Sequence, residues 1–336
     1  METTPVLATT LDLRIFSAIA EELAPSTRRA YKVQLGLLRS FYTERGWKVF
    51  DTDGETFVVH VLEYFSAQVA AGRSLSTINK TIAALRWEAG FTNPAYVGLL
   101  SSRPVKAFLA GATRQQRSRQ VRKAKALTLN DLKQVQGYLV SQKGSVVLRN
   151  RALLALGVAT ALRASSIVEL TLGDITRAST IDGFLVRVRF SKTDQTGEGV
   201  DIPVLRAADR LLDPVRAVEQ WVKHLKDIGI TDPKAPLFPR IRKSVVTTES
   251  ISSADVVVTK ILRDLLVDSG TVDAPDVTDY SSHSIRATFI TLSALAGVPE
   301  ASIATVSGHK SMKVLRAYDR SGVERHAQVS YLGQPS

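Results

Sequence analysis

The amino-terminal third of the chain carries apolar residues three and four positions apart, interrupted by turn residues. Val33, Leu37 and Phe41 recur at this spacing, which is typical of the buried face of an amphipathic helix. Helices are predicted in this way over residues 12–24, 27–45, 55–71, from 76 onward and over about 105–113. Ser26 is expected to cap the second of them and Ser76 to open the fourth. Residues 1–115 are therefore predicted to form a helical domain.

The helical pattern resumes after residue 127 and continues almost to the end of the chain. Helices are predicted over residues 128–141, 146–162, 164–170, 213–228 and 252–268, then in two segments that begin near 282 and 299, with a short last helix around 318. Thr128 is expected to cap the first of these, and Ser281 or Ser282 the helix that follows residue 281. The proline-rich segment around 233–239 is expected to be a loop.

One stretch changes from the helical period to an alternating one. Phe184, Val186 and Val188 alternate with residues of the opposite face, and the alternation returns over residues 200–204, as in half-buried strands. With residues 172–175, these segments predict a small three-stranded antiparallel sheet. The predicted fold class is mainly α with a small antiparallel β-sheet. It comprises a helical domain, a linker over residues 116–126 and an α+β domain over residues 127–336.

The charge of the chain favours a polyanionic partner. The net charge is +12, and nucleic acid or an anionic membrane surface would both match it. Basic residues crowd the linker and its borders, namely Arg114, Arg117, Arg119, Arg122, Lys123 and Lys125. This segment is either a solvated linker or a strap along a phosphate backbone, and the basic charge of the whole chain favours the strap. Arg73, Lys80 and Arg86 lie off the apolar stripe of the fourth helix and are further candidate DNA contacts.

Composition also excludes several kinds of chemistry. The chain has no cysteine, which rules out disulfides, thiolate nucleophiles and cysteine-bound zinc. His283 and His309 lack a clear third ligand, so neither a metal nor a cofactor is expected. No run of about eighteen apolar residues occurs, and the amino terminus lacks the pattern of a signal peptide. The expected location is intracellular: cytoplasmic and associated with the nucleoid if the source is prokaryotic.

The last quarter of the chain holds polar residues that stability does not require. His283 and Arg286 lie three apart at the start of a helix, His309 follows a glycine, and Tyr318 comes nine residues later. Arginines can hold the non-bridging oxygens of a phosphodiester without Mg²⁺, and a phenol can attack the phosphorus. Taken singly, each residue also has an ordinary structural explanation; Arg286, for example, could pair with Asp279.

Taken together, these residues resemble the motifs of the tyrosine recombinase (phage integrase) family. The matching segments are TALRASSIVEL around Arg163, FSKT with Lys192, HSIR with His283 and Arg286, SGHK with His309, and Tyr318. The resemblance covers almost the whole chain. It implies that residues 1–115 are a core-binding domain and that residues 127–336 are the catalytic domain with its tail. The six catalytic residues would be Arg163, Lys192, His283, Arg286, His309 and Tyr318.

The resemblance also implies the roles of these residues. Arg163 and Arg286 would clamp the scissile phosphate while His309 donates a hydrogen bond to it. Lys192 would protonate the leaving 5′ oxygen, and His283 would move a proton to or from the nucleophile Tyr318. The partner would be double-stranded DNA, cut and rejoined by four protomers through a Holliday junction, with accessory DNA-bending proteins as possible helpers.

The sequence departs from the family pattern at one position. The family usually has an acidic residue three positions after the first arginine, where this chain has Ser166; the nearest acid is Glu169. This difference concerns the residues that support the catalytic cluster. Two alternatives to a recombinase remain at this point. One is a catalytically degenerate DNA-binding protein of the same fold, and the other is a type IB-like topoisomerase.

Overall fold

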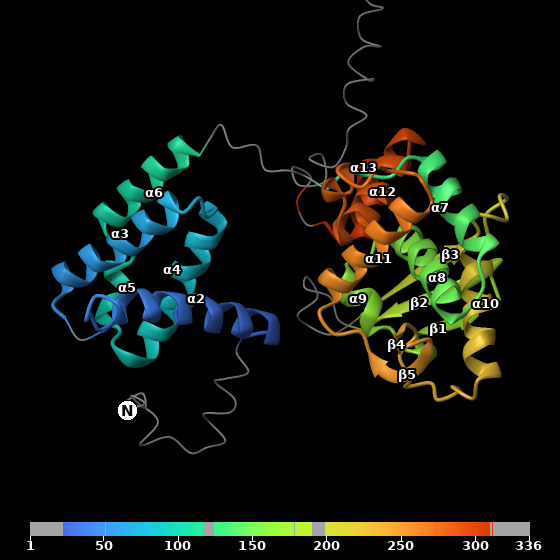
Figure 1. The fold of residues 1–336 in the computed structure, drawn as a ribbon, viewed down its shortest axis with the longest axis horizontal. Coiled ribbons are helices and arrows are strands. Elements are labelled where there is room, and N and C mark those ends of the chain that lie inside the picture. Colours follow the sequence, from blue (N-terminus) through green and yellow to red (C-terminus); the bar gives the residue numbers. More distant parts are fainter. Residues whose placement is uncertain are drawn as a thin grey trace, which may run out of the picture. The chain divides into compact units, whose positions relative to one another are not determined.

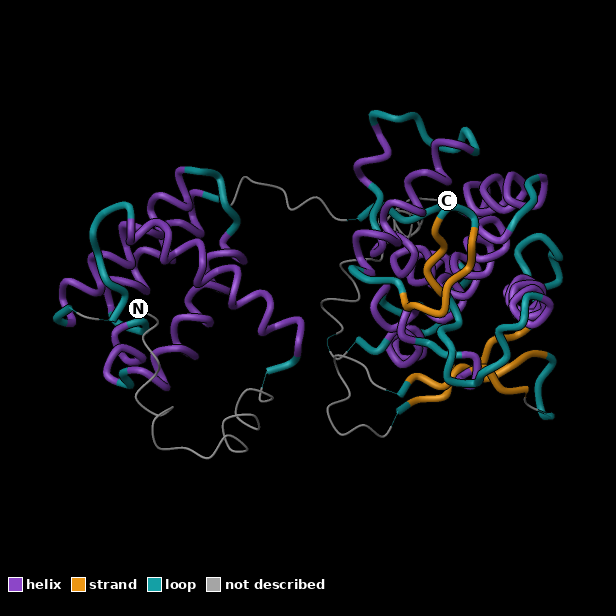
Figure 2. The backbone as a smooth tube through the Cα atoms, turned by 60° about the horizontal axis from the view of Figure 1, so that its bottom comes forward, coloured by secondary structure: helices purple, strands orange, loops and turns teal. Residues whose placement is uncertain are grey.

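The computed structural model describes residues 23–50, 52–116, 124–177, 179–189, 199–309 and 311. Contacts divide the chain into two units, Met1–Val121 and Arg122–Ser336, each with a large hydrophobic core. Helices dominate both units, and the strands form small antiparallel sheets in the second (Figure 2). The predicted fold class is therefore confirmed. Within the described residues, no helix combines the length and apolar content that a bilayer crossing requires.

The first unit is helical throughout its described part (Figure 1). Its helices are α2 (Pro25–Thr43), α3 (Gly54–Ala70), α4 (Leu75–Thr92), α5 (Ala95–Leu99) and α6 (Arg103–Gln115). Leu38 of α2, Phe65 of α3 and Leu85 of α4 are completely buried in one cluster. The predicted periodicity therefore marks real core positions. The helix predicted over residues 12–24 lies almost wholly outside the described residues.

Two predicted helix starts in this unit are wrong. The helix α2 begins at Pro25, with Ala24 as its N-cap, so Ser26 lies inside the helix. Proline fits the first turn because its missing N–H would have no helical partner there. In α4 the cap is Ser74, whose Oγ accepts a hydrogen bond from Thr77 N at 3.2 Å, so the helix starts before Ser76. The short helix α5 was not predicted, because five residues are too few to show a period.

The second unit is built around α8 (Ser145–Thr160). Its other helices are α7 (Leu129–Ser141), α9 (Ala164–Glu169), α10 (Pro214–Asp227), α11 (Ala254–Asp268), α12 (Ser282–Leu295) and α13 (Glu300–Ser307), with short 3-10 turns η2 (Leu172–Asp174) and η3 (Asp276–Asp279). The helix α8 packs against α7, α9, α10 and α12 (Figure 1). Thr128 and Asp131 form the predicted cap of α7 as a reciprocal capping box.

The three-stranded sheet has the order β1 (Ile175–Arg177), β2 (Gly183–Val188), β3 (Val200–Leu205), and all its pairs are antiparallel. Phe184 pairs with Val204, and Val186 with Ile202; all four side chains are buried on the core face. The alternating pattern predicted this sheet correctly. The first strand starts later than predicted, because Leu172–Asp174 is a 3-10 turn closed by a capping box between Thr171 and Asp174.

A second, two-stranded sheet was missed in and after the proline-rich segment. Strands β4 (Pro239–Arg242) and β5 (Val245–Ser250) form a hairpin apart from the three-stranded sheet (Figure 2). Lys243 and Ser244 form its turn with φ values of 46° and 67°, the left-handed geometry that tight hairpins require. Neither residue is typical of such a turn, and most of the strand residues are not buried. The sequence therefore lacks the usual hairpin signals.

Gly157 of α8 lets the helices of the candidate site approach one another. A Cβ atom there would lie 2.8 Å from Ile285 Cγ2 and 3.1 Å from Ile167 Cδ1. Ile285 precedes Arg286 on α12, and Ile167 lies on α9, which begins after Arg163. Any side chain at position 157 must therefore displace the side chains of Ile285 and Ile167 or move the helices α12 and α9 that carry them.

We expect Gly157→Ala to destabilise the fold. Glycine to alanine in a helix normally stabilises by up to about 1 kcal/mol, but overpacking costs about 1–3 kcal/mol, so the expected net loss is about 1–2 kcal/mol. Urea unfolding would measure the difference. The control is Gly137→Ala on α7, where an added Cβ meets nothing within 4 Å, so this variant should keep or raise stability. Equal stability changes in the two variants would contradict the close-approach explanation.

Candidate active site

The amino-terminal end of α12 is held firmly in place. Ser281 is the N-cap and forms a reciprocal capping box with Ser284. Ser282 donates from its backbone N to Thr259 Oγ1 at 2.8 Å and from its Oγ to Asp255 Oδ1 at 3.0 Å, both on α11. Of the two predicted caps, Ser281 is therefore the correct one. These bonds fix the first two turns of α12, which carry His283 and Arg286.

Arg286 reaches from α12 to the end of α8. Its side chain is buried, with 5% of its surface exposed, and its Nη1 donates to the backbone oxygen of Ala161 at 2.8 Å. Ala161 follows the last residue of α8 in the left-handed conformation, with φ of 52°. Arg163 follows two residues later as the N-cap of α9. Arg286 therefore joins α12 to the segment that connects α8 and α9.

His309 lies in the turn after α13 and contacts Arg286. Its Nδ1 lies 2.8 Å from Ser307 Oγ, and Arg286 Nη2 lies 3.2 Å from His309 Nδ1 and 3.3 Å from Nε2. When the Ser307 hydroxyl donates to Ile303 O at 2.6 Å, its oxygen can accept a hydrogen bond from His309 in the tautomer that carries its proton on Nδ1. This tautomer leaves the Nε2 lone pair towards Arg286. Gly308, with φ of 63°, provides the left-handed turn that brings the ring back.

The surroundings of His309 keep its imidazole neutral. Burial and the positive charges of Arg286 and Arg163 together lower the pKa of His309 from 6.5 to about 4, with burial as the largest cause. Arg286 contacts the ring directly, and Arg163, two residues after Ala161, is close enough for its charge to lower this pKa as well. Three residues from distant parts of the sequence thus form one cationic cluster.

The lowered pKa of His309 predicts a pH dependence of stability. An unfolded His309 takes up a proton near pH 6.5, whereas the folded residue does so only near pH 4, so this contribution to stability is lost as the pH falls through that window. We expect wild-type protein to lose more stability than His309→Gln between about pH 7 and pH 5. Urea unfolding at both pH values measures this, and equal losses would contradict the prediction.

The remaining predicted catalytic residues are only partly described. His283 is exposed on the first turn of α12. Lys192 lies in the undescribed segment 190–198, and Tyr318 in the undescribed residues from 312 onward. Their assignments therefore remain predictions. Among the described residues, no group of three or more histidines and carboxylates is arranged to hold a metal ion.

Several residues that support the cluster were not singled out in the sequence. The backbone oxygen of Ala161 and the hydroxyl of Ser307 both contact it, but the sequence predicts neither contact. Ser307 stands two positions before His309, which is the only local signal. Ser166, which stands where the family usually has an acidic residue, is buried on α9. Partial burial raises the pKa of Glu169, the nearest acid. Neither side chain is bonded to the cluster in the described interactions.

Asp174 and Arg189 form an ion pair at the end of β2. Asp174 is buried, accepts hydrogen bonds from Thr171 and pairs with Arg189 Nε at 2.8 Å. Arg189 directly follows β2 and is the last described residue before the segment that contains Lys192. The ion pair therefore fixes the point at which that segment leaves the sheet.

The candidate DNA contacts differ in how they are held. Arg73, Lys80 and Arg114 are exposed on the first unit. Arg86 is tied to its own domain, because its Nη2 donates to Leu100 O at 3.1 Å and to Ser101 Oγ at 2.8 Å. Lys125 lies with its ammonium 5.5 Å from the ring centre of Tyr280. Arg117, Arg119, Arg122 and Lys123 lie outside the described residues.

A mainly helical unit with a small antiparallel sheet and this cationic cluster has the architecture of the tyrosine recombinase family. A model of the phage integrase family matches residues 125–325, and the chain belongs to that family. An integrase/recombinase XerD homologue of Selenomonas ruminantium is 24% identical over 318 residues, which are 93% of this chain and 86% of that protein.

Solved structures share the fold at low sequence identity. The Tn1549 transposon integrase in complex with transposon right end DNA has a TM-score of 0.60 at 14% identity, covering 94% of this chain and 98% of that one. The XerH site-specific recombinase bound to palindromic difH substrate, in a post-cleavage complex, has a TM-score of 0.57 at 13% identity, covering 90% and 79%. A lambda integrase dimer bound to a COC′ core site has a TM-score of 0.54 at 16% identity, covering 91% and 75%.

Proposed function

We propose that this protein is a site-specific DNA recombinase. It cleaves and rejoins DNA strands through a 3′-phosphotyrosyl intermediate and a Holliday junction, without metal or ATP. The observation that carries the proposal is the convergence of Arg163, Arg286 and His309 where α8 ends and α9 begins. Paired guanidiniums beside an imidazole match the charge that gathers on a phosphodiester under attack.

The proposed reaction assigns one step to each residue. Arg163 and Arg286 hold the two non-bridging oxygens of the scissile phosphate. The Tyr318 oxygen attacks the phosphorus, the phenol proton leaves through His283, and the bond to the 5′ oxygen breaks. Lys192 donates a proton to that 5′ oxygen. The bond energy stays in the phosphotyrosine, so attack by a second 5′-hydroxyl rejoins the strands without ATP and releases the tyrosine.

His309 needs a proton on Nε2, as the imidazolium or as the other neutral tautomer, before it can donate to the phosphate. In the tautomer described above, its Nε2 lone pair cannot donate a hydrogen bond to a phosphate oxygen. The phosphate brings negative charge next to the arginines that hold the pKa of His309 down. This charge favours the imidazolium, whose Nε2–H can then donate to the phosphate. His309 is thus a hydrogen-bond donor that DNA itself switches on.

The partner of the proposed reaction is double-stranded DNA. The net charge of +12 supports this partner, because each phosphate that a basic residue neutralises releases bound counterions. Strand exchange between two duplexes requires four active sites, so we propose that four protomers assemble on DNA, with accessory DNA-bending proteins where the site requires them. The candidates for backbone contacts among the described residues are Arg73, Lys80, Arg86, Arg114 and Lys125.

A nicked suicide substrate tests the proposal. Footprinting on the DNA that flanks the gene identifies the binding site, and a nick beside the cleavage point traps the covalent intermediate. We expect a denaturant-resistant protein–DNA adduct that forms equally well in excess EDTA, because the guanidiniums carry out the charge stabilisation that Mg²⁺ performs in nucleases. Loss of cleavage on chelation would indicate a metal-dependent nuclease instead.

Two other outcomes separate the alternatives. Binding without any adduct on the nicked substrate would indicate a catalytically degenerate DNA-binding protein of the same fold. Relaxation of a supercoiled plasmid that lacks the footprinted site would indicate a type IB-like topoisomerase, because that enzyme cleaves without sequence choice.

A further inference from the structure

A cavity of about 380 Å³ opens between α7, α8 and α10, on the part of α8 away from the arginine cluster. Arg151 of α8 lines this cavity. It lies ten residues before Ala161, so the cavity is about 15 Å along α8 from the candidate active site. None of the predicted catalytic or DNA-contact residues lines it. The volume falls in the range of small-molecule sites.

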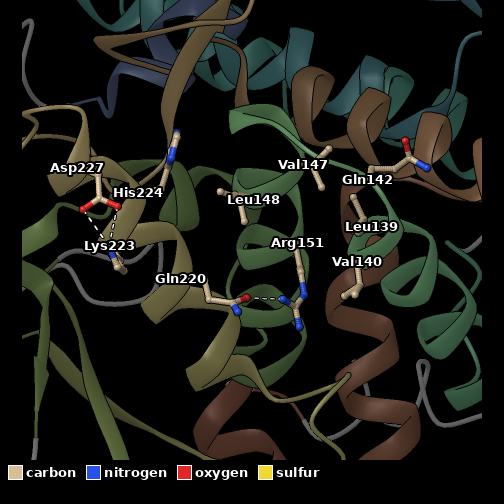
Figure 3. A pocket seen from close by; sticks show the side chains of 10 residues that line it. All are labelled: Leu139, Val140, Gln142, Val147, Leu148, Arg151, Gln220, Lys223, His224 and Asp227. Atoms are coloured by element: carbon tan, nitrogen blue, oxygen red, sulfur yellow. Dashed lines mark hydrogen bonds and ion pairs between the residues drawn. The ribbon is translucent and has the colours of Figure 1, made fainter.

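A buried cation lines the cavity. Arg151 has 7% of its surface exposed, and its Nη1 donates to Gln220 Oε1 of α10 (Figure 3). Its Nε–H is closed to solvent and has no hydrogen-bond partner among the described residues. A buried charge costs free energy unless it is paired, so a ligand in the cavity that accepts hydrogen bonds from this guanidinium offsets that cost.

No carboxylate of the described residues forms an ion pair with Arg151. Asp213 raises the pKa of Arg151 and Arg216 lowers it, while burial is the largest cause of the lowering. Asp213 itself is occupied: its Oδ1 accepts from Val215 N at 2.9 Å, and its Oδ2 lies 3.3 Å from Arg206 Nη1. The guanidinium of Arg151 therefore lacks a direct counter-ion, and the cavity beside it suits an anion.

The rest of the lining limits what this anion can be. Leu139, Val140, Val147 and Leu148 give the cavity apolar walls. Lys223 adds no second available cation, because its Nζ is held by Asp227 at 3.0 and 2.8 Å (Figure 3). A phosphate dianion carries two negative charges, and the single guanidinium would neutralise only one of them. A ligand without an apolar part would leave the apolar side chains of the cavity exposed to water.

We propose that this cavity binds a small organic carboxylate with an apolar body. The carboxylate accepts hydrogen bonds from the guanidinium of Arg151, and the apolar body lies against Leu139, Val140, Val147 and Leu148. Binding of this kind is independent of the recombination chemistry, so the two can succeed or fail separately. The helix α8 connects the site to Ala161, the residue that Arg286 contacts.

Thermal unfolding of the full chain without DNA tests the site with three probes. Hexanoate has both the carboxylate and the apolar body, hexanol lacks the charge, and inorganic phosphate lacks the apolar body. We expect a saturable rise in Tm on the order of several °C with hexanoate and none with the other two. A rise in Tm with phosphate equal to that with hexanoate would show that the apolar body does not contribute to binding. An equal rise with hexanol would show that the carboxylate does not contribute, and either result would overturn the proposal.

Variants assign any shift to this cavity. Arg151→Met should abolish the hexanoate shift, and without hexanoate it should unfold at the wild-type temperature or above, because it removes an uncompensated buried cation. Lys260→Met is the control: it removes an exposed cation, paired with Asp264 on α11, that does not line the cavity, and it should leave the shift intact. A hexanoate shift that persists in Arg151→Met would overturn the proposal.

A rim variant keeps the test decisive if Arg151→Met fails to fold. Val140 is 54% exposed, so Val140→Asp should leave the fold intact. The added carboxylate would repel hexanoate and weaken its apparent affinity by about tenfold or more, given like charges at the edge of a partly buried site. Unchanged affinity in Val140→Asp would place hexanoate elsewhere and contradict the assignment.

Discussion

Tyr318→Phe should abolish the covalent protein–DNA adduct and leave DNA binding unchanged. The phenol oxygen is the atom that forms the phosphoester in the proposed reaction, and phenylalanine lacks only that atom. Removing a nucleophile costs several orders of magnitude in rate, so the adduct should fall below detection. The nicked suicide substrate measures adduct formation, and a mobility-shift assay on the same duplex measures binding.

Tyr331→Phe is the matched control for this variant. It removes a hydroxyl from another tyrosine in the carboxy-terminal segment, thirteen positions away in the sequence. We expect Tyr331→Phe to form the adduct at the wild-type rate. An adduct that survives in Tyr318→Phe would reassign the nucleophile, and its loss in Tyr331→Phe but not in Tyr318→Phe would identify the other tyrosine.

Arg286→Ala should lower the cleavage rate by about 10²–10³-fold, as for the loss of one charged donor to a transition state. Arg286 also bonds Ala161 O and contacts His309, so the variant leaves a buried carbonyl unpaired at a cost of about 1–3 kcal/mol. Arg286→Lys keeps the charge but loses the planar two-donor geometry, and we expect it to cleave at an intermediate rate. Single-turnover cleavage at saturating protein measures both variants.

Arg263→Ala is the control that separates catalysis from folding. Arg263 also lies in the second unit and also donates to backbone oxygens, to Tyr280 O at 2.7 Å and to Thr278 O at 2.9 Å. Its loss should reduce Tm by an amount comparable to that in Arg286→Ala, but the folded fraction should cleave normally. Near-normal cleavage by Arg286→Ala would remove Arg286 from the phosphate clamp.

Local sequence patterns predicted most of the elements because each depends on neighbouring residues. Thr128 and Asp131 lie three apart and cap α7 as expected, and the alternation of Phe184, Val186 and Val188 marks the buried face of β2. The start of α2 was wrong because proline at the first helical position outcompeted the nearby serine. The hairpin β4–β5 was missed because its turn and its mostly unburied strands lack the usual residue types.

The composition of the candidate site could be read from the sequence, but its assembly could not. Motif spacing singled out Arg163, Arg286 and His309 as the arginines and imidazole of a phosphate site. The bond from Arg286 to Ala161 O joins residues 125 positions apart, and it depends on a left-handed backbone at a residue that rarely adopts one. No local pattern encodes such a contact, because it arises only when α8 and α12 pack together.

The sequence by itself determined the helical periods, the small sheet, the absence of cysteine chemistry and the residues expected to form a phosphate site. Only the tertiary structure decided that Gly157 packs against Ile285 of α12, that the surroundings of His309 hold its pKa near 4, and that buried Arg151 has no ion pair among the described residues. The physical reason is that periodicity and capping depend on residues a few positions apart. Burial, close approach and the charge around a group depend on helices that meet only in the folded chain.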